Sequence, residues 1–217
     1  MNPFYNLRQQ RQIGGPGWSL RLSTGPASEP VTVAQLKAQE RIDGSDEDTY
    51  LGDLISVARE HLEDICGRAC ITQAWKQYFD RFPCSSNDFL ELRRGPLISV
   101  ASVKYTDSTG AQTTMVEGTD YLVNSSRDPG RIVLPYGGIW PAAVLSPASP
   151  VEVTFSVGHD VSPSTVPARM KQAILLLAAH LFQNREPVLS GSGVAAIEIP
   201  MSVEALIEPL RYSYFGD

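Results

Sequence analysis

One apolar segment near the carboxyl end limits what this chain can fold into. It reads VPARMKQAILLLAAHLFQNREP and covers residues 166–187. A membrane-spanning helix needs about twenty mainly apolar residues, whereas the apolar run from Ala173 to Phe182 has ten, with His180 among them. Pro167 suits the first turn of a helix, where its missing N–H costs nothing, and Pro187 is expected to end the helix. The segment therefore predicts a helix buried in a protein core.

The covering of this helix is the first structural question. Residues 173–179 are consecutive apolar residues, so apolar side chains point in almost every direction around the axis, whereas a surface helix keeps a polar face. Either the chain itself wraps the helix, or one covering element comes from another copy. The core is expected to contain Met170, Ile174, Leu177 and Leu181 with Leu54, Ala58 and Leu62. The face expected to meet a neighbouring subunit contains Leu175, Ala178 and Ala179.

Four parts follow one another along the chain. Residues 1–30 are expected to form a flexible N-terminal arm, because residues 14–30 contain seven Gly or Pro, and Trp18 is its candidate contact. Residues 31–70 predict two helices, one capped by Thr32 and one opened by Ser45, and Gly67 is expected to end the second. Residues 161–217 predict the long apolar helix and a short final helix opened by Ser202.

Residues 71–160 change to the two-residue period of strands, with turn signals between the runs. Such short strands with short turns predict an antiparallel meander or a small open barrel. The fold class is therefore α+β, a small helical bundle of N-terminal and C-terminal helices with a central antiparallel β insertion. The expected strands begin at Ile71 and then cover residues 89–92, 98–106, 113–116, 121–124, 131–134 and 151–157.

No catalytic constellation is recognisable in the sequence. His61 lies on an acidic helix and His180 in apolar surroundings, whereas His159 and Asp160 follow a strand. The three cysteines, Cys66, Cys70 and Cys84, lack the usual zinc spacings, and without a visible export signal they indicate buried thiols in a reducing compartment. We therefore expect no enzymatic activity, no metal and no cofactor. A small metal-dependent hydrolase using His159 and Asp160 and a monomeric β-type binding module stay as alternatives.

The charge distribution argues against tight nucleic-acid binding. The formal net charge is −6, and no stretch of clustered Lys and Arg is present that would neutralise phosphates. DNA could still pass along such a protein without being held by it.

The order of three motifs resembles a known family. RGPLISVASVKY, PGRIVLPYGGIWP and KQAILLLAAHLFQNRE occur in that order, and within residues 31–212 the chain resembles the head-tail connector proteins of tailed bacteriophages, also called adaptor or head-completion proteins. The resemblance implies a structural protein of the virion neck, assembled in the host cytoplasm into a ring, dodecameric by expectation, under the portal protein. Such a ring extends the DNA channel and provides the docking surface for a stopper or tail-completion protein.

The C-terminal segment is the candidate for contact with the portal, because aromatic side chains near a free terminus often anchor interfaces. Folding back onto the subunit's own surface is the open alternative. The segment contains Leu206, Leu210, Arg211, Tyr212, Tyr214 and Phe215.

Overall fold

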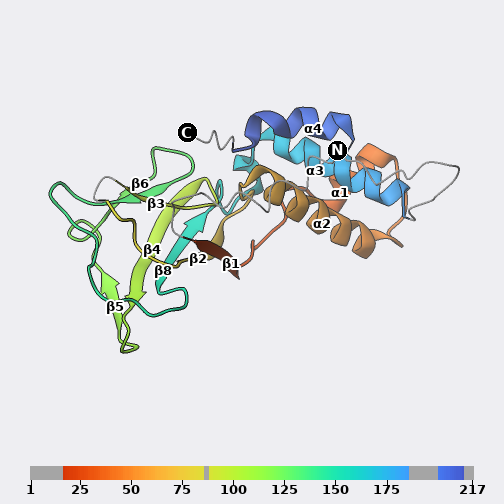
Figure 1. Cartoon of the computed structure of the whole chain (residues 1–217). Helices are drawn as coiled ribbons and strands as arrows, with labels where there is room; N and C mark the ends of the chain where they lie inside the picture. Colours follow the sequence, from red (N-terminus) through yellow and green to blue (C-terminus); the bar gives the residue numbers. More distant parts are fainter. Residues whose placement is uncertain (1–16, 86–87, 186–199, 213–217) are drawn as a thin grey trace, which may run out of the picture. The chain divides into compact units, whose positions relative to one another are not determined.

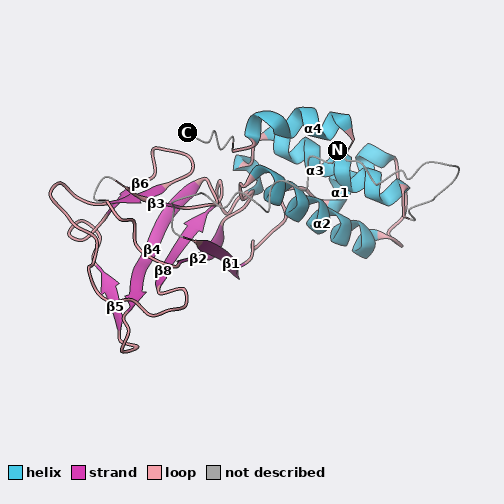
Figure 2. Ribbon diagram, viewed as in Figure 1, coloured by secondary structure: helices cyan, strands magenta, loops and turns pink. Residues whose placement is uncertain are grey.

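The computed structural model describes residues 17–85, 88–185 and 200–212 (Figure 1). The chain divides into two compact units. The β unit is drawn from Met1–Ser23, Ala74–Arg93 and Ser99–Ser156. The helical unit is drawn from Thr24–Gln73, Arg94–Ile98 and Val157–Asp217. The predicted α+β class is confirmed, with the helices and the strands as Figure 2 shows them.

The helical unit contains four α-helices. They are α1 (Val33–Glu40), α2 (Asp48–Cys66), α3 (Ala168–Gln183) and α4 (Met201–Ile207), with 3₁₀ turns at Pro163–Thr165 and Glu208–Leu210. Thr32 caps α1 in a reciprocal capping box with Gln35, and Gly67 ends α2 in the left-handed conformation at φ 70°. Both terminal signals are thus read correctly from the sequence.

Three helix boundaries differ from the predictions. Helix α2 begins at Asp48 and not directly after Ser45, because the preceding residues form a turn. Helix α3 ends at Gln183, and the backbone amide of the following residue, Asn184, donates to His180 O at 3.0 Å. Pro187, the predicted helix end, lies outside the described residues. Helix α4 begins one residue before Ser202, after Pro200.

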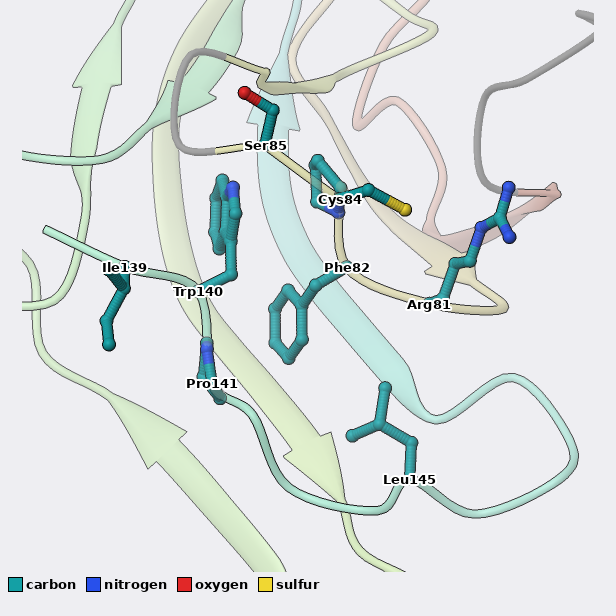
Figure 3. Close-up of a pocket in the computed structure, with 9 residues that line it drawn as sticks. Arg81, Phe82, Cys84, Ser85, Ile139, Trp140, Pro141 and Leu145 are labelled. Atoms are coloured by element: carbon teal, nitrogen blue, oxygen red, sulfur yellow. The ribbon is translucent and has the colours of Figure 1, made fainter.

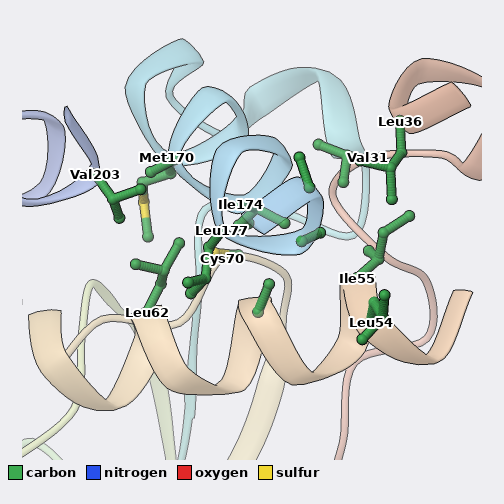
Figure 4. Close-up of a cluster of buried hydrophobic side chains, with 14 of the residues drawn as sticks. Val31, Leu36, Leu54, Ile55, Leu62, Cys70, Met170, Ile174, Leu177 and Val203 are labelled. Atoms are coloured by element: carbon green, nitrogen blue, oxygen red, sulfur yellow. The ribbon is translucent and has the colours of Figure 1, made fainter. Parts of the chain in front are cut away.

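Helix α3 is enclosed by helices of its own chain. It packs against α1, α2 and α4, and Figure 4 shows Met170, Ile174 and Leu177 among side chains of the surrounding elements. Ala178 is 0% exposed and Ala179 is 5% exposed, so the face assigned to a neighbouring subunit is wrong for these two residues. Leu175 is half-buried against the same core. Sequence periodicity could not reveal that the short α1 and α4 cover this face.

A buried ion pair lies on α2 and connects it to Glu29 of the preceding segment. Arg59 and Glu63, 5% and 2% exposed, are joined by a bond of 3.1 Å between Arg59 Nη1 and Glu63 Oε2. Arg59 Nε also donates to Glu29 Oε2 at 2.8 Å. Burial alone lowers the pKa of the Arg59 guanidinium, but the hydrogen bond to Glu29 and the nearby carboxylates Glu63, Glu29 and Glu60 outweigh it and raise the pKa. The cation is therefore permanently charged.

Glu63 links this pair to the chain that follows α2. Its carboxylate accepts hydrogen bonds from Cys70 N at 2.7 Å and from Gln73 Nε2 at 3.0 and 2.9 Å. Its carbonyl oxygen accepts from Arg94 Nη1 at 2.7 Å. A buried carboxylate is tolerated because it is both paired and hydrogen-bonded. Nothing in the helical pattern distinguishes Glu63 from its solvated neighbours, and the sequence analysis did not predict this network.

The β unit contains a five-stranded and a three-stranded sheet. The first has the order β1-β2-β8-β4-β5 and the second the order β3-β7-β6. Antiparallel pairs join β4 with β5, β3 with β7 and β6 with β7. Their bounds are β1 (Trp18–Thr24), β2 (Gln73–Phe79), β3 (Leu90–Glu91), β4 (Leu97–Thr106), β5 (Gln112–Met115), β6 (Leu122–Asn124), β7 (Arg131–Val133) and β8 (Val151–Val157).

Two features of the sheets correct the sequence analysis. The order is not a meander, because β8 lies between β2 and β4. Residues 18–24 were assigned to a flexible arm but form the edge strand β1. Six of the seven β1 residues are exposed, so the strand lacks the apolar alternation by which half-buried strands are recognised. The predicted contact residue Trp18 is 47% exposed, with the Arg93 guanidinium 5.4 Å from its ring centre.

A charge placed at Ala178 tests the enclosure of α3. We expect Ala178→Glu to lower the free energy of unfolding by at least about 3 kcal/mol, because it places an unpaired carboxylate in a closed apolar core. Ala168→Glu is the matched control: the same change on the same helix, at an exposed first-turn position where a carboxylate is tolerated. Urea unfolding followed by circular dichroism measures both, and equal stabilities of the two variants would contradict the enclosure.

The second prediction concerns the buried carboxylate. Glu63→Gln removes the charge that Arg59 faces, and breaking a buried pair from one side costs about 3–5 kcal/mol. Glu60→Gln, on the same helix but with a side chain 70% exposed, should change stability by less than about 0.5 kcal/mol. The same urea titrations compare them. A Glu63→Gln chain as stable as the Glu60→Gln chain would show that the pair contributes nothing.

Candidate assembly surfaces

The predicted portal-docking segment lies, as far as it is described, against its own helical unit. Arg68 Nε donates to Leu210 O at 2.7 Å, and Tyr212 N donates to Cys66 O at 3.3 Å. The Arg68 guanidinium also lies 4.6 Å from the centre of the Tyr212 ring, a cation–π distance. The residues from 206 to 212 are therefore held at the carboxyl end of α2.

Part of this segment is still available at the surface. Leu206 and Leu210 are half-buried against the core, and Arg211 and Tyr212 are also of intermediate exposure. Arg211 Nη1 lies 3.4 Å from Glu208 Oε2, an exposed carboxylate. Tyr214 and Phe215 lie outside the described residues. Fold-back is thus observed for residues 206–212, whereas contact of the segment with a portal stays a prediction.

Gly67 has a second role beside ending α2. A Cβ atom at this position would lie 2.7 Å from Tyr212 Cδ2, closer than real side chains allow. The positive φ of Gly67 and the approach of the Tyr212 ring therefore require the same residue type. The sequence analysis recognised the helix end, but the ring contact depends on a residue far away in the chain.

The start of α2 carries a cluster of charged and aromatic side chains. Arg185 pairs with Glu47, and its guanidinium lies 4.9 Å from the centre of the Tyr50 ring and 4.6 Å from that of Phe182. Asp48 Oδ1 lies 2.7 Å from Lys37 Nζ. The acidic side chains here thus have cationic partners within the same unit. Across the described part of the chain, no group of three or more His, Cys, Asp or Glu is arranged to hold a metal ion.

The histidines occupy three different environments. His61 is exposed, and His180 is half-buried with its Nδ1 3.3 Å from Asn184 Nδ2. His159 is half-buried, and its backbone N donates to Cys70 O at 3.3 Å. Asp160 is exposed, and its carbonyl accepts from Thr72 N at 3.0 Å. The His159–Asp160 turn thus connects backbone segments, and this geometry does not favour the hydrolase alternative.

The cysteines follow the predicted pattern only in part. Cys66 and Cys70 are buried, whereas Cys84 is exposed. Burial is the main cause that raises the pKa of the Cys66 thiol to about 11, and burial followed by the Glu63 charge raises the pKa of Cys70 as well. The thiols of Cys66 and Cys70 are therefore protonated and inaccessible at neutral pH.

No helix among the described residues has the length and apolarity that a membrane crossing requires.

Exposed apolar side chains gather on one loop of the β unit. Tyr136 is fully exposed, and Ile139 and Val144 are 80% and 75% exposed. Three large exposed apolar side chains within nine residues make this loop a candidate contact surface. Tyr136 and Ile139 belong to the motif PGRIVLPYGGIWP, but no contact was predicted for this loop from the sequence.

Comparisons with known proteins agree with these observations. A sequence model of the family described as "Phage gp6-like head-tail connector protein" matches residues 30–117. A comparison with curated protein sequences finds no significant match.

Three solved structures share the fold. A chain from the neck of the empty gene transfer agent (GTA) particle, computed with C6 symmetry, has a TM-score of 0.71 at 23% identity, covering 89% of this chain and 95% of that one. A chain from the virion of the native GTA particle has a TM-score of 0.69 at 22% identity, covering 88% and 94%. A chain from the native GTA neck computed with C12 symmetry has a TM-score of 0.67 at 22% identity, covering 89% and 94%. The predicted resemblance to head-tail connector proteins is therefore confirmed by the family match over residues 30–117, and the chain shares its fold with chains of the GTA neck and virion.

Proposed function

We propose that this chain is a structural head-tail connector of a phage-like particle. The observation that carries the proposal is the match of residues 30–117 to the connector family, supported by a fold shared over most of the chain with neck proteins. The protein acts by shape and contact, without catalysing a reaction. It is located in the virion neck and is assembled in the host cytoplasm.

A ring under the portal is the proposed working form. The similar neck structures were computed with C6 and C12 symmetry, and twelve subunits is the stoichiometry we propose. A ring of identical subunits needs two different surfaces that meet head to tail. The enclosed face of α3 supplies neither of them, since Ala178 and Ala179 are buried within the subunit. We propose the exposed loop with Tyr136, Ile139 and Val144 as one of the two.

The DNA channel imposes an electrostatic requirement on such a ring. DNA must move along the lumen during packaging and ejection, so tight phosphate binding would hinder the particle. The formal net charge of −6 and the absence of clustered basic residues in the sequence fit a wall that DNA passes without binding. A stopper or tail-completion protein would dock on the opposite side of the ring from the portal.

The C-terminal segment is the proposed portal contact. Arg68 fixes the chain at Leu210 and Tyr212, so the point immediately before residues 213–217 is defined. Tyr214 and Phe215 are aromatic residues of the kind that dominate interface energetics. The proposal is supported by the contacts of Arg68 with Leu210 and Tyr212, which fix the chain just before these two aromatic residues.

Portal binding tests both parts of the proposal. We expect the full chain to co-sediment with portal rings and to form rings on them in electron micrographs. Replacing residues 213–217 by a Gly-Ser sequence of equal length should weaken portal binding at least about tenfold, because about 1.4 kcal/mol of contact energy corresponds to a factor of ten. Tyr212 stays in place in this variant, so the helical unit is unchanged.

The two outcomes of failure are distinct. Unchanged binding of the Gly-Ser variant would contradict the C-terminal contact and leave the connector role intact. A full chain that neither binds nor assembles on portal rings of its own particle would contradict the connector role itself.

A further inference from the structure

We propose that a pocket in the β unit is the docking site for the chain's own N-terminal segment, with Ile13–Pro16 as the part that enters it. The proposal goes beyond the connector function, since it concerns a contact within one subunit. It rests on the shape and lining of the pocket, on a buried N–H group in its wall, and on the point at which the N-terminal segment leaves the folded unit.

The pocket has a volume of about 410 Å³ and lies between the 81–85 and 139–145 loops (Figure 3). Its walls include Phe82, Trp140, Pro141 and Leu145. Phe82 and Trp140 stack with ring centres 5.4 Å apart and an interplanar angle of 17°. This volume is within the range of sites for small ligands, about 300–1,000 Å³, and the lining suits an aliphatic or proline side chain.

Trp140 adds a polar requirement to this apolar site. The residue is 8% exposed, and its indole Nε1 is buried with no hydrogen-bond partner among the described residues. Figure 3 shows this nitrogen on the edge of the ring that faces the loop with Cys84 and Ser85. Buried indole N–H groups usually have an acceptor. A backbone carbonyl entering beside Ser85, with a small shift of the loop, would supply one.

The N-terminal segment joins the described chain beside the strand end that leads into the pocket wall. Asp80 N donates to Gly17 O at 3.0 Å, and the next residue, Arg81, lines the pocket. A Cβ atom on Gly17 would meet only the end of the flexible Asp80 side chain, which can turn away. The backbone hydrogen bond therefore marks the point from which residues 1–16 continue.

The residues next to Gly17 have the chemistry that the pocket requires. Ile13-Gly14-Gly15-Pro16 offers one aliphatic side chain, one proline ring and two glycine carbonyls that no Cβ shields. Four extended residues reach roughly 14 Å at most, so only the immediate surroundings of Gly17 are accessible to them. A segment tethered at Gly17 has an effective concentration in the millimolar range, which favours it over a neighbouring copy's segment or an unrelated peptide.

Disulfide trapping tests this contact in the complete chain. Cys84 lines the pocket and is exposed, whereas Cys66 and Cys70 are buried. In a Gln12→Cys chain, mild oxidation at high dilution should form a bond to Cys84 within one polypeptide, seen as a faster-migrating monomer on non-reducing gels. Moving the target thiol to the exposed turn residue Ser108, as Cys84→Ser with Ser108→Cys, should slow trapping at least about tenfold.

A second substitution separates docking from simple proximity. Gln12→Cys combined with Ile13→Asp keeps the tether and the thiols but removes the aliphatic side chain, and trapping at Cys84 should slow at least about fivefold. Ile13 comes before β1 (Trp18–Thr24) in the sequence, so this variant changes no residue in the strands of the β unit. Equal trapping rates with and without Ile13→Asp, or equal rates at Cys84 and at the thiol introduced by Ser108→Cys, would overturn the proposal.

The size of the disulfide-linked species also shows whether the segment in the pocket comes from the same chain or from another copy. Disulfide-linked dimers in place of the fast-migrating monomer would overturn the assignment to the chain's own segment and point to a neighbouring copy. The experiment needs no portal and no ring, so its failure would leave the connector function untouched. Conversely, a chain that traps as expected but does not bind a portal would contradict only the connector function.

Discussion

The burial of α3 by its own chain is the constraint on which the helical unit depends. Met170, Ile174 and Leu177 meet side chains of α2 across the core, and each such residue contributes about 1.5–3 kcal/mol when removed from water. The small residues Ala173 and Ala178 lie on the same helix and are fully buried. Small side chains permit a close approach of the surrounding helices, so α1 and α4 can close the remaining sides of a short bundle.

This closure changes the reasoning about assembly. An apolar helix does not need a second subunit if two short helices of its own chain shield it. Contacts in the proposed ring must then come from surfaces that the subunit leaves exposed, and the loop with Tyr136, Ile139 and Val144 is such a surface. A subunit with a closed core can fold before it assembles, which is compatible with the proposed ring.

The sequence predicted local structure well where periodicity and terminal signals were clear. The capping box at Thr32, the end of α2 at Gly67 and the alternation of Val151–Val157 depend on near neighbours in the chain. The order of strands in a sheet and the pairing between them depend on residues far apart in the chain, so they were not predictable. The position of β8 between β2 and β4, for example, has no local signal in the sequence. The exposed strand β1 lacks an apolar pattern, so its pairing with β2 was also missed.

The candidate sites show the same division. The buried carboxylate of Glu63 and the contact of Tyr212 with Arg68 join residues that the sequence keeps apart or leaves unmarked. The family resemblance, in contrast, was confirmed by the match over residues 30–117, which contains the first of its three motifs, RGPLISVASVKY, but not the other two.

The dependence of unfolding on protein concentration tests the closed core most directly. If one chain completes the core around α3, the midpoint of urea unfolding is the same from micromolar to hundreds of micromolar protein, since no association is linked to folding. A midpoint that rises steadily with protein concentration would show that a second copy supplies part of the core, and it would contradict the enclosure of α3 within one subunit.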